Sequence, residues 1–235
     1  MVHPKTRPSL LVLVRHGHSI MNQVKGHNAY VPDEESGKAV EGIPDHMMPL
    51  TERGVQQAIH TGEHLKKTYG DFDVVYDSNY LRTIQTRTHA LQAYTQHELS
   101  RMKIRHNIFL RERSNGYTYG MTQQEADIHF PYLQKYWGQT GPFYATPPGG
   151  ESQANVCQRL FLFIGELFRI RGGQKILVFA HGHSIRAMRY NLEGWTPQMF
   201  IDGIKEGPDN CGIVVYSFST ETGRLALMEY NKVYW

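Results

Sequence analysis

Cysteine is scarce in this chain of 235 residues, which contains only Cys157 and Cys211. Two cysteines cannot form the disulfide framework of a small secreted domain, and they cannot form a cysteine-rich zinc site. We therefore expect a reducing compartment and interpret the protein as cytoplasmic.

Long apolar runs are also lacking. The run nearest the N-terminus, LLVLV at 10–14, is too short to span a membrane, and Arg15 follows it in place of a small-residue cleavage site. This pattern predicts neither a membrane anchor nor a signal peptide.

No segment concentrates charge of one sign. The chain has 25 Lys and Arg against 22 Asp and Glu, a net charge of +3, and its basic residues are scattered. Nucleic-acid partners favour a basic stripe, so we expect none, whereas a small anionic substrate suits this composition. Hydrophobic residues make up 40% of the chain, which is enough for a sizeable core.

Short apolar segments alternate with helical patterns along the chain. Strands are predicted at 9–14, 71–78, 102–110 and 175–180, and helices at 49–70, 78–94 and 151–173. This alternation is typical of the α/β class and predicts a three-layer α/β/α sandwich around a mostly parallel sheet. Residues 211–232 are expected to add a hairpin at the edge of that sheet, with its turn at STETG.

Helix ends are indicated by capping residues. Thr51 is expected to cap the helix at 49–70, and Gly70 to stop it. Ser78 or Asn79 is expected to cap the helix at 78–94.

Two segments, 24–48 and 138–150, have no period and are rich in Gly and Pro. Such long loops in a compact domain are usually lids or mobile functional segments. Because no linker divides the chain, we interpret residues 1–235 as one domain with a loop insertion at about 24–48.

The pentapeptide HGHSI occurs twice, at 16–20 and 181–185, each time directly after a predicted buried strand. An internal duplication would extend beyond five residues. A zinc site is disfavoured because the strand end turns the second imidazole of each pair away, and no Asp or Glu lies beside either pair. The remaining functional interpretation places both histidines at the carboxyl edge of the sheet, where α/β proteins bind phosphate. A purely structural role for one or both stays open.

The residues around these pentapeptides resemble a known family. Together they are similar to the histidine phosphatase superfamily, in its phosphoglycerate mutase-like branch, and the resemblance extends from about residue 10 to 217. The blocks are, in order, VRHGHSIMN (14–22), PLTERGVQQA (49–58), SNYLRTIQT (78–86), LRERSNG (110–116), PPGGES (147–152), AHGHSIRAM (180–188) and NCGIVVY (210–216).

This resemblance implies a nucleophile and a phosphate clamp. His16 would attack as a neutral imidazole and form a phosphohistidine, with the proton on its other nitrogen held by a hydrogen-bond acceptor. Arg15 and Arg82 would grip the phosphoryl oxygens with planar guanidinium groups, and they would also disfavour the imidazolium form of His16. His181 would donate to the same oxygens in the transition state.

Glu112 lies where the family has its general acid. The alternative is a surface salt bridge with one of the neighbouring arginines, Arg111 or Arg113. Because some relatives draw their acid from elsewhere, the acidic residues Asp33, Glu34 and Glu35 of the long loop are rivals.

Further residues are candidates for substrate binding. Asn22 matches a phosphate-pocket position of the signature and could equally lie on a helix surface. Ser19, Gly182 and His183 are the other candidates in the two pentapeptides. Aromatic side chains could line the entrance or simply pack their loops: Tyr117, Tyr119, Tyr136, Trp137, Phe143 and Tyr144.

Three departures from the mutase pattern favour hydrolysis. His18 stands where mutases often have Glu, and the loop before Pro49 is longer than theirs. Residues 132–146 contain one lysine and several aromatics in place of an Arg- and Tyr-rich segment that grips a second acidic group.

We therefore expect a metal-independent phosphomonoesterase, without a cofactor, that acts on a small phosphorylated metabolite. A phosphoglycerate mutase and a catalytically inactive phosphate-binding or scaffold protein stay open. The sequence leaves the oligomeric state open, a homodimer included.

Overall fold

The computed structural model describes residues 6–203 and 207–235, whose strands form one six-stranded sheet in the order β3-β2-β4-β1-β5-β6. The first four strands along the chain run parallel to one another, β5 is antiparallel to β1, and β6 is antiparallel to β5. The strands are β1 (Leu10–Arg15), β2 (Val74–Asp77), β3 (Lys103–His106), β4 (Lys175–Ala180), β5 (Ile213–Ser219) and β6 (Arg224–Lys232).

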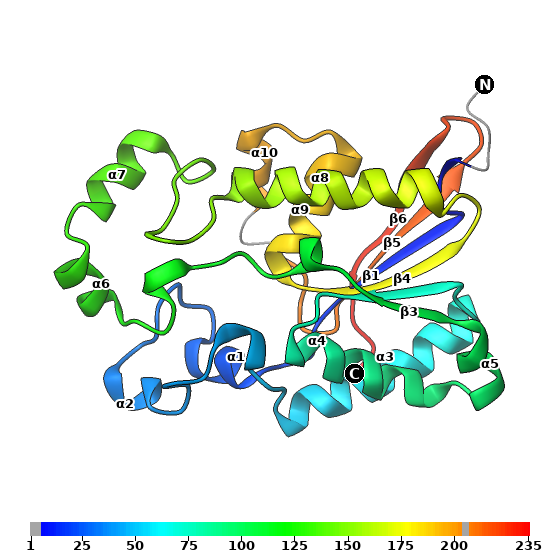
Figure 1. Ribbon diagram of the computed structural model, residues 1–235, viewed down its shortest axis with the longest axis horizontal. Coiled ribbons are helices and arrows are strands. Elements are labelled where there is room, and N and C mark those ends of the chain that lie inside the picture. The colour runs from blue at the N-terminus through cyan, green and yellow to red at the C-terminus, as the bar shows by residue number, and fades with distance from the viewer. Residues whose placement is uncertain (1–5, 204–206) are drawn as a thin grey trace.

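Helices cover both faces of this sheet. The α-helices are α1 (Ile20–Lys25), α2 (Glu34–Gly37), α3 (Glu52–Tyr69), α4 (Leu81–Ala90), α5 (Gln96–Arg101), α6 (Gln123–His129), α7 (Leu133–Thr140), α8 (Gln153–Ile170), α9 (Gly182–Glu193) and α10 (Pro197–Asp202). Short 3-10 turns are η2 (Asp45–Met47), η3 (Leu91–Ala93), η4 (Ile108–Leu110) and η5 (Gly116–Thr118). In Figure 1, α8, α9 and α10 lie on one face and α3, α4 and α5 on the other, while α6 and α7 extend beyond the sheet. No helix in the described part of the chain is both long enough and apolar enough to cross a membrane.

The core consists of two apolar layers, one on each face of the sheet. Leu11 and Leu13 of β1 belong to the cluster that includes α8 and α9, and Val12 and Val14 belong to the cluster that includes Leu65 of α3. Because side chains alternate across a strand, a strand buried on both faces is a continuous apolar run. The predicted α/β class and three-layer arrangement are confirmed.

Most predicted elements agree with the structure, but the strand predicted at 102–110 is confined to β3, and its last part forms the turn η4. The strand at 175–180 has the predicted bounds, and β5 and β6 form the predicted hairpin at one edge. Helix α3 begins after Thr51, whose hydroxyl accepts from the Gly54 N–H, and it ends at Gly70 with a φ of 63°.

The start of the helix predicted at 78–94 was wrong. Helix α4 begins at Leu81 with Tyr80 in the cap position, and no side chain caps it. The hydroxyl of Ser78 accepts from the Tyr80 N–H at 3.3 Å, before the helix, and also contacts Thr83 and His181. The apparent cap signal therefore belongs to a different interaction, described below.

The segment 24–48 is ordered around short helices. It contains the end of α1, then α2, and then η2, which brings Asp45 back to α4. The segment 138–150 contains the end of α7 and a series of turns.

The crossing of α3 over α4 predicts a stability difference between two helical glycines. A Cβ on Gly62 of α3 would overlap the carbonyl group of Ala90, whereas a Cβ on Gly165 of α8 would meet nothing within 4 Å. Gly62→Ala should lower the free energy of unfolding by about 1–3 kcal/mol through overpacking. Gly165→Ala should raise it by about 0.5–1 kcal/mol because alanine favours the helix. Urea denaturation measures both, and equal effects of the two substitutions would contradict this account of the packing.

Candidate active site

Two neighbouring parallel strands bring the repeated histidines together. Arg15 at the end of β1 pairs with Ala180 at the end of β4, so the next residue of each strand lies at the same edge. The His16 N–H donates to the Ala180 carbonyl at 3.0 Å. The His16 and His181 ring centroids lie 5.2 Å apart in a T-shaped arrangement. The two HGHSI segments therefore meet at one point.

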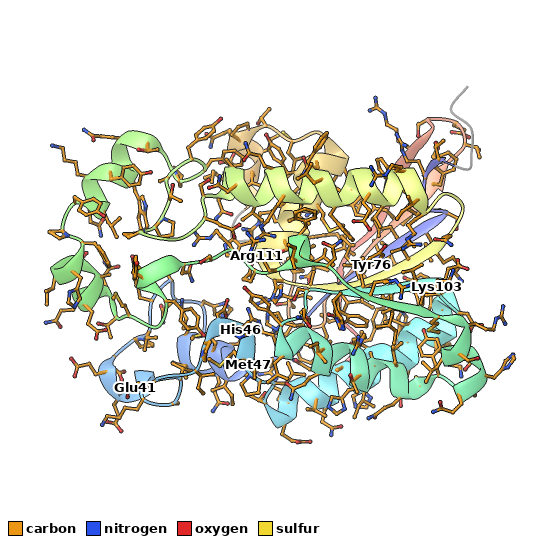
Figure 2. The ribbon with its side chains drawn as sticks, viewed as in Figure 1. Glu41, His46, Met47, Tyr76, Lys103 and Arg111 are labelled. Carbon is orange, nitrogen blue, oxygen red and sulfur yellow. The ribbon has the colours of Figure 1, made fainter. Side chains whose placement is uncertain are left out.

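A cavity of about 180 Å³ opens at these strand ends. The predicted site residues that line it are Arg15, His16, Ser19, Asn22, Arg82, Glu112 and His183. His181 and Gly182 are not in the lining, and His181 is completely buried. In Figure 2, Arg111 lies on the segment that follows η4, and His46 lies on η2 below it.

The rival acids and most of the suggested aromatic residues lie elsewhere. Asp33 and Glu34 line separate cavities, and Asp33 caps α2. Glu35 pairs with Lys38 on the surface. Tyr119 lines the small cavity, whereas Phe143 is buried in the apolar core, so its suggested position at an entrance was wrong.

His16 is held in one orientation by its own backbone. Its Nδ1 lies 2.8 Å from the carbonyl oxygen of Gly17, which can only accept, so Nδ1 carries the proton. In the neutral ring Nε2 is then unprotonated and nucleophilic. Burial, followed by the charges of Arg82 and Arg15, holds the pKa of His16 well below its usual range.

The turn after His16 requires glycine. A Cβ on Gly17 would overlap the carbonyl of Gly54 in α3. The Gly17 N–H donates to Thr86 Oγ1 at 3.0 Å, and that hydroxyl donates in turn to the Arg82 carbonyl. Helices α3 and α4 therefore fix the position of the nucleophile.

The two predicted arginines line the same cavity as His16. Arg82 is only 4% exposed, and its Nη1 lies 3.0 Å from a carboxylate oxygen of Asp45. Arg15 Nη1 donates to the Pro208 carbonyl at 2.8 Å, and its buried Nε has no hydrogen-bond partner among the described residues. Gly182, the first residue of α9, packs beside that Nε. The positive end of the α9 dipole therefore lies next to the Arg15 guanidinium.

His181 contacts a short chain of hydroxyl groups. Its Nε2 lies 2.8 Å from Ser78 Oγ, which lies 2.9 Å from Thr83 Oγ1. Burial, followed by the charge of Arg82, holds the pKa of His181 well below its usual range. The ring also packs edge-on against Tyr80, at 5.1 Å between centroids.

Glu112 pairs with the second histidine of the second pentapeptide. Its Oε1 lies 3.3 Å from His183 Nδ1 and accepts from the Arg113 N–H at 2.8 Å. Burial alone would raise the pKa of Glu112, but the interactions with His183, His181 and this N–H outweigh it and hold the pKa well below its usual range. The alternative salt bridge with Arg111 does not form, since Arg111 pairs with Glu151.

Ser19 and Asn22 bind each other in a capping box at the start of α1. The Ser19 hydroxyl accepts from the Asn22 N–H and donates to Asn22 Oδ1. Asn210 also donates to that oxygen, at 3.1 Å. The Ser19 hydroxyl and Asn22 Oδ1 are therefore both occupied, and the side-chain N–H groups of Asn22 remain to face the cavity.

The two HGHSI segments make different contacts, although their sequences are identical. His18 contacts Thr51 at the start of α3, whereas His183 contacts Glu112. Ser19 caps α1, whereas Ser184 is buried in α9 and donates to the Arg111 carbonyl at 2.6 Å.

Several residues of the site escaped the sequence analysis. Asp45 and Lys25 lie at the cavity but belong to a segment without period, which gave no signal. Ser78 and Tyr80 lie in the block SNYLRTIQT and contact His181. Ser78 was interpreted only as a possible helix cap, and no sequence signal pointed to Tyr80. Arg113 follows Glu112 and also lines the cavity.

No cluster of three or more His, Cys, Asp or Glu side chains in the ranges 6–203 and 207–235 is arranged to hold a metal ion.

Comparison with known proteins gives one consistent family. A sequence model of the histidine phosphatase superfamily (branch 1) matches residues 11–231. The 2,3-bisphosphoglycerate-dependent phosphoglycerate mutase of Methylobacterium radiotolerans is 33% identical over 189 residues, which cover 80% of each chain.

Solved structures share the fold. The phosphoserine phosphatase of Entamoeba histolytica, in complex with 3-phosphoglyceric acid, superposes with a TM-score of 0.68 at 22% identity and covers 95% of this chain and 97% of its own. Mycobacterial glucosyl-3-phosphoglycerate phosphatase, with inorganic phosphate, gives 0.66 at 21% identity and covers 96% and 98%.

The buried histidines predict how stability depends on pH. Because the pKa of His16 and of His181 is lowered in the folded protein, the unfolded chain binds more protons below about pH 6.5, the usual value. The free energy of unfolding should therefore fall as pH is lowered from about 7 to 5, by at most about 1.4 kcal/mol per pH unit for each histidine. Urea denaturation at a series of pH values measures this slope. His16→Gln and His181→Gln should each flatten it, and an unchanged slope in both variants would contradict the assignment.

Proposed function

This chain belongs to the histidine phosphatase superfamily, and we propose that it is a phosphomonoesterase that hydrolyses small phosphate esters through a phosphohistidine on His16. The nucleophile would be Nε2. The Nδ1–H···O=C bond to Gly17, at 2.8 Å, is the observation that carries the proposal. It leaves a lone pair on the other nitrogen of a ring that burial, together with Arg82 and Arg15, keeps neutral.

Charge around His16 supports binding of a phosphoryl group. Arg15 and Arg82 supply planar donors, and the amide hydrogens of Asn22 and the positive end of α9 add further ones. Such donors stabilise the charge of the transition state without a metal ion. Asp45 pairs with Arg82, and an incoming phosphoryl group would take over that guanidinium.

The cavity suits a small substrate. Its volume is about 180 Å³, below the several hundred that a drug-sized ligand occupies. A phosphorylated metabolite whose alcohol part extends outward from the clamp would fit.

Glu112 would exchange protons with the ester and with water. It is a carboxylate in the free protein, held by His183, and the approach of an anionic phosphoryl group would raise its pKa. The protonated acid would donate to the departing alkoxide as the bond between phosphorus and that oxygen breaks. The carboxylate so formed would take a proton from the water that attacks the phosphohistidine.

Two observations favour hydrolysis over transfer back to the product. A mutase must hold a second acidic group of its substrate, and no residue of 132–146 lines the cavity. Asn28, an exposed residue, also lines the cavity, so water can reach it.

A phosphoglycerate mutase is the second candidate. The mutase relative at 33% identity favours it, as do Lys25 and Arg113, two cations at the cavity besides the phosphate clamp. Isomerisation of a phosphoglycerate, primed by a bisphosphoglycerate, would identify this activity.

Trapping the covalent intermediate tests the proposed function. Denaturation without acid, soon after mixing with a phosphate ester, should leave phosphate on His16 that is labile to acid and stable to alkali. Free phosphate should be released with water as the only phosphoryl acceptor, and chelators should not prevent this release. Phosphate retained by a His16→Ala variant would refute the nucleophile. Binding of phosphate with no turnover would instead support a phosphate-binding or scaffold protein.

The leaving group tests Glu112. The comparison uses kcat/KM, which reports the steps through departure of the leaving group and not the later attack of water. Glu112→Gln should hardly lower kcat/KM for nitrophenyl phosphate, whose leaving group departs without a proton, but should lower kcat/KM for alkyl phosphates by about 10²- to 10⁴-fold. Glu34→Gln is the matched control, because Glu34 was a rival acid and lies outside the cavity. It should change neither rate. An equal loss on both substrates in Glu112→Gln, with chemistry rate-limiting, would mean that Glu112 positions groups rather than transferring a proton.

A further inference from the structure

The hydroxyl chain beside His181 can be assigned proton by proton. Thr83 Oγ1 lies 2.8 Å from the Tyr80 carbonyl oxygen, which has no proton of its own, so Thr83 must donate there. Thr83 Oγ1 lies 2.9 Å from Ser78 Oγ, and since the Thr83 proton is already used, Ser78 donates in that contact. One proton then lies between Ser78 Oγ and Thr83 Oγ1, and one between Thr83 Oγ1 and the Tyr80 carbonyl oxygen.

The end of this chain is the ring of His181. Ser78 Oγ has given its single proton to Thr83, yet it lies 2.8 Å from His181 Nε2. Nε2 must therefore carry a proton and donate it to Ser78. The reverse direction would leave Thr83 Oγ1 and the Tyr80 carbonyl in contact with no proton between two lone pairs. In the neutral ring Nδ1 is then an acceptor, so the donor role expected for His181 from the family resemblance does not hold for its free nitrogen.

Nδ1 of His181 is buried and has no hydrogen-bond partner among the described residues. Buried polar atoms are normally paired, so a bound ligand is expected to complete this one. The charged and titratable groups that act on the ring are Arg82, Glu112, His16 and Arg159, and Tyr80 packs against it. Burial and Arg82 oppose a second proton on the ring more strongly than Glu112 favours it.

We propose that Ser78 and Thr83 are positioning residues that fix His181 as the Nε2–H tautomer, so that the site binds the phosphoryl group in its singly protonated form. This step rests on the proposed function: His181 does not line the cavity of the free protein, but its ring centroid lies 5.2 Å from that of His16, so a phosphoryl group at His16 would be the ligand that reaches Nδ1. The phosphoryl O–H donates to Nδ1, because an unprotonated phosphoryl oxygen would face a lone pair there. Above the second pKa of the phosphate, about 6 for an ester, binding of the dianion therefore takes up one proton from solution.

Nitrogen NMR of the free protein tests the tautomer without any activity. In protein labelled with ¹⁵N in histidine, the His181 ring should show a protonated Nε2 and an unprotonated Nδ1. Thr83→Val removes the acceptor of the Ser78 proton, which then turns to Nε2, so the tautomer should switch to Nδ1–H. Thr86→Val is the matched control, a buried threonine in the same helix whose hydroxyl is not in this chain. It should leave the tautomer unchanged. An Nδ1–H tautomer in the unmodified protein would overturn the proposal whether or not Thr83→Val folds.

Calorimetry with an alkyl phosphonate, a non-hydrolysable analogue whose dianion has no proton, tests the bound form. Titration well above the second pKa of the phosphonate, at about pH 9, in buffers of different ionisation enthalpy should show uptake of about one proton per phosphonate bound, and close to none in Thr83→Val. Glu112→Gln distinguishes the source, because uptake should persist there if the proton lies at His181. Loss of uptake in Glu112→Gln would overturn the proposal. If neither the phosphonate nor inorganic phosphate binds, the proposed function is refuted and the protonated phosphoryl group with it, while the tautomer result stands separately.

Discussion

The hydrogen bond from His16 Nδ1 to the Gly17 carbonyl is the interaction on which the site depends. It sets the tautomer and the direction of the ring at once, because the acceptor is the next residue of the same chain. The bond needs a tight turn at the end of β1. That turn packs Gly17 against Gly54 of α3 and holds the Gly17 N–H through Thr86 of α4.

These contacts connect the nucleophile to the phosphate clamp. Thr86 contacts both Gly17 and the backbone of Arg82, so one helix positions the ring and one of the two guanidinium groups. Arg15 precedes His16 on the same strand, and β4 delivers His181 alongside. The parallel pairing of β1 and β4 therefore brings Arg15, His16 and His181 together at one edge of the sheet. A short motif at the end of each strand is sufficient to place them, and no long loop is needed.

The sequence could predict the parts of the fold and site that depend on local pattern. Buried strands read as apolar runs, Thr51 and Gly70 mark the ends of α3, and both HGHSI segments follow such strands. Asp45 could not be predicted, because its contact with Arg82 depends on the path of a segment without period.

The errors have a physical cause of the same kind. Ser78 looks like a helix cap because a local hydroxyl usually binds the nearest free N–H, yet a distant histidine competes for it. The partner of Glu112 likewise comes from α9, 71 residues further along the chain, and no local pattern links Glu112 to His183. Phe143 lies in a Gly- and Pro-rich loop but is covered by Tyr190 and Phe200, which are also far away in sequence.

The position of the phosphate on the trapped His16 ring tests the central claim most directly. Because Nδ1 is bound to the Gly17 carbonyl, the phosphoryl group should be attached to Nε2. Coupling between phosphorus and ¹⁵N in the phosphorylated, histidine-labelled protein identifies the nitrogen. Phosphorus coupled to Nε2 of His16 is the result we predict, and phosphorus on Nδ1, or on His181, would contradict the account.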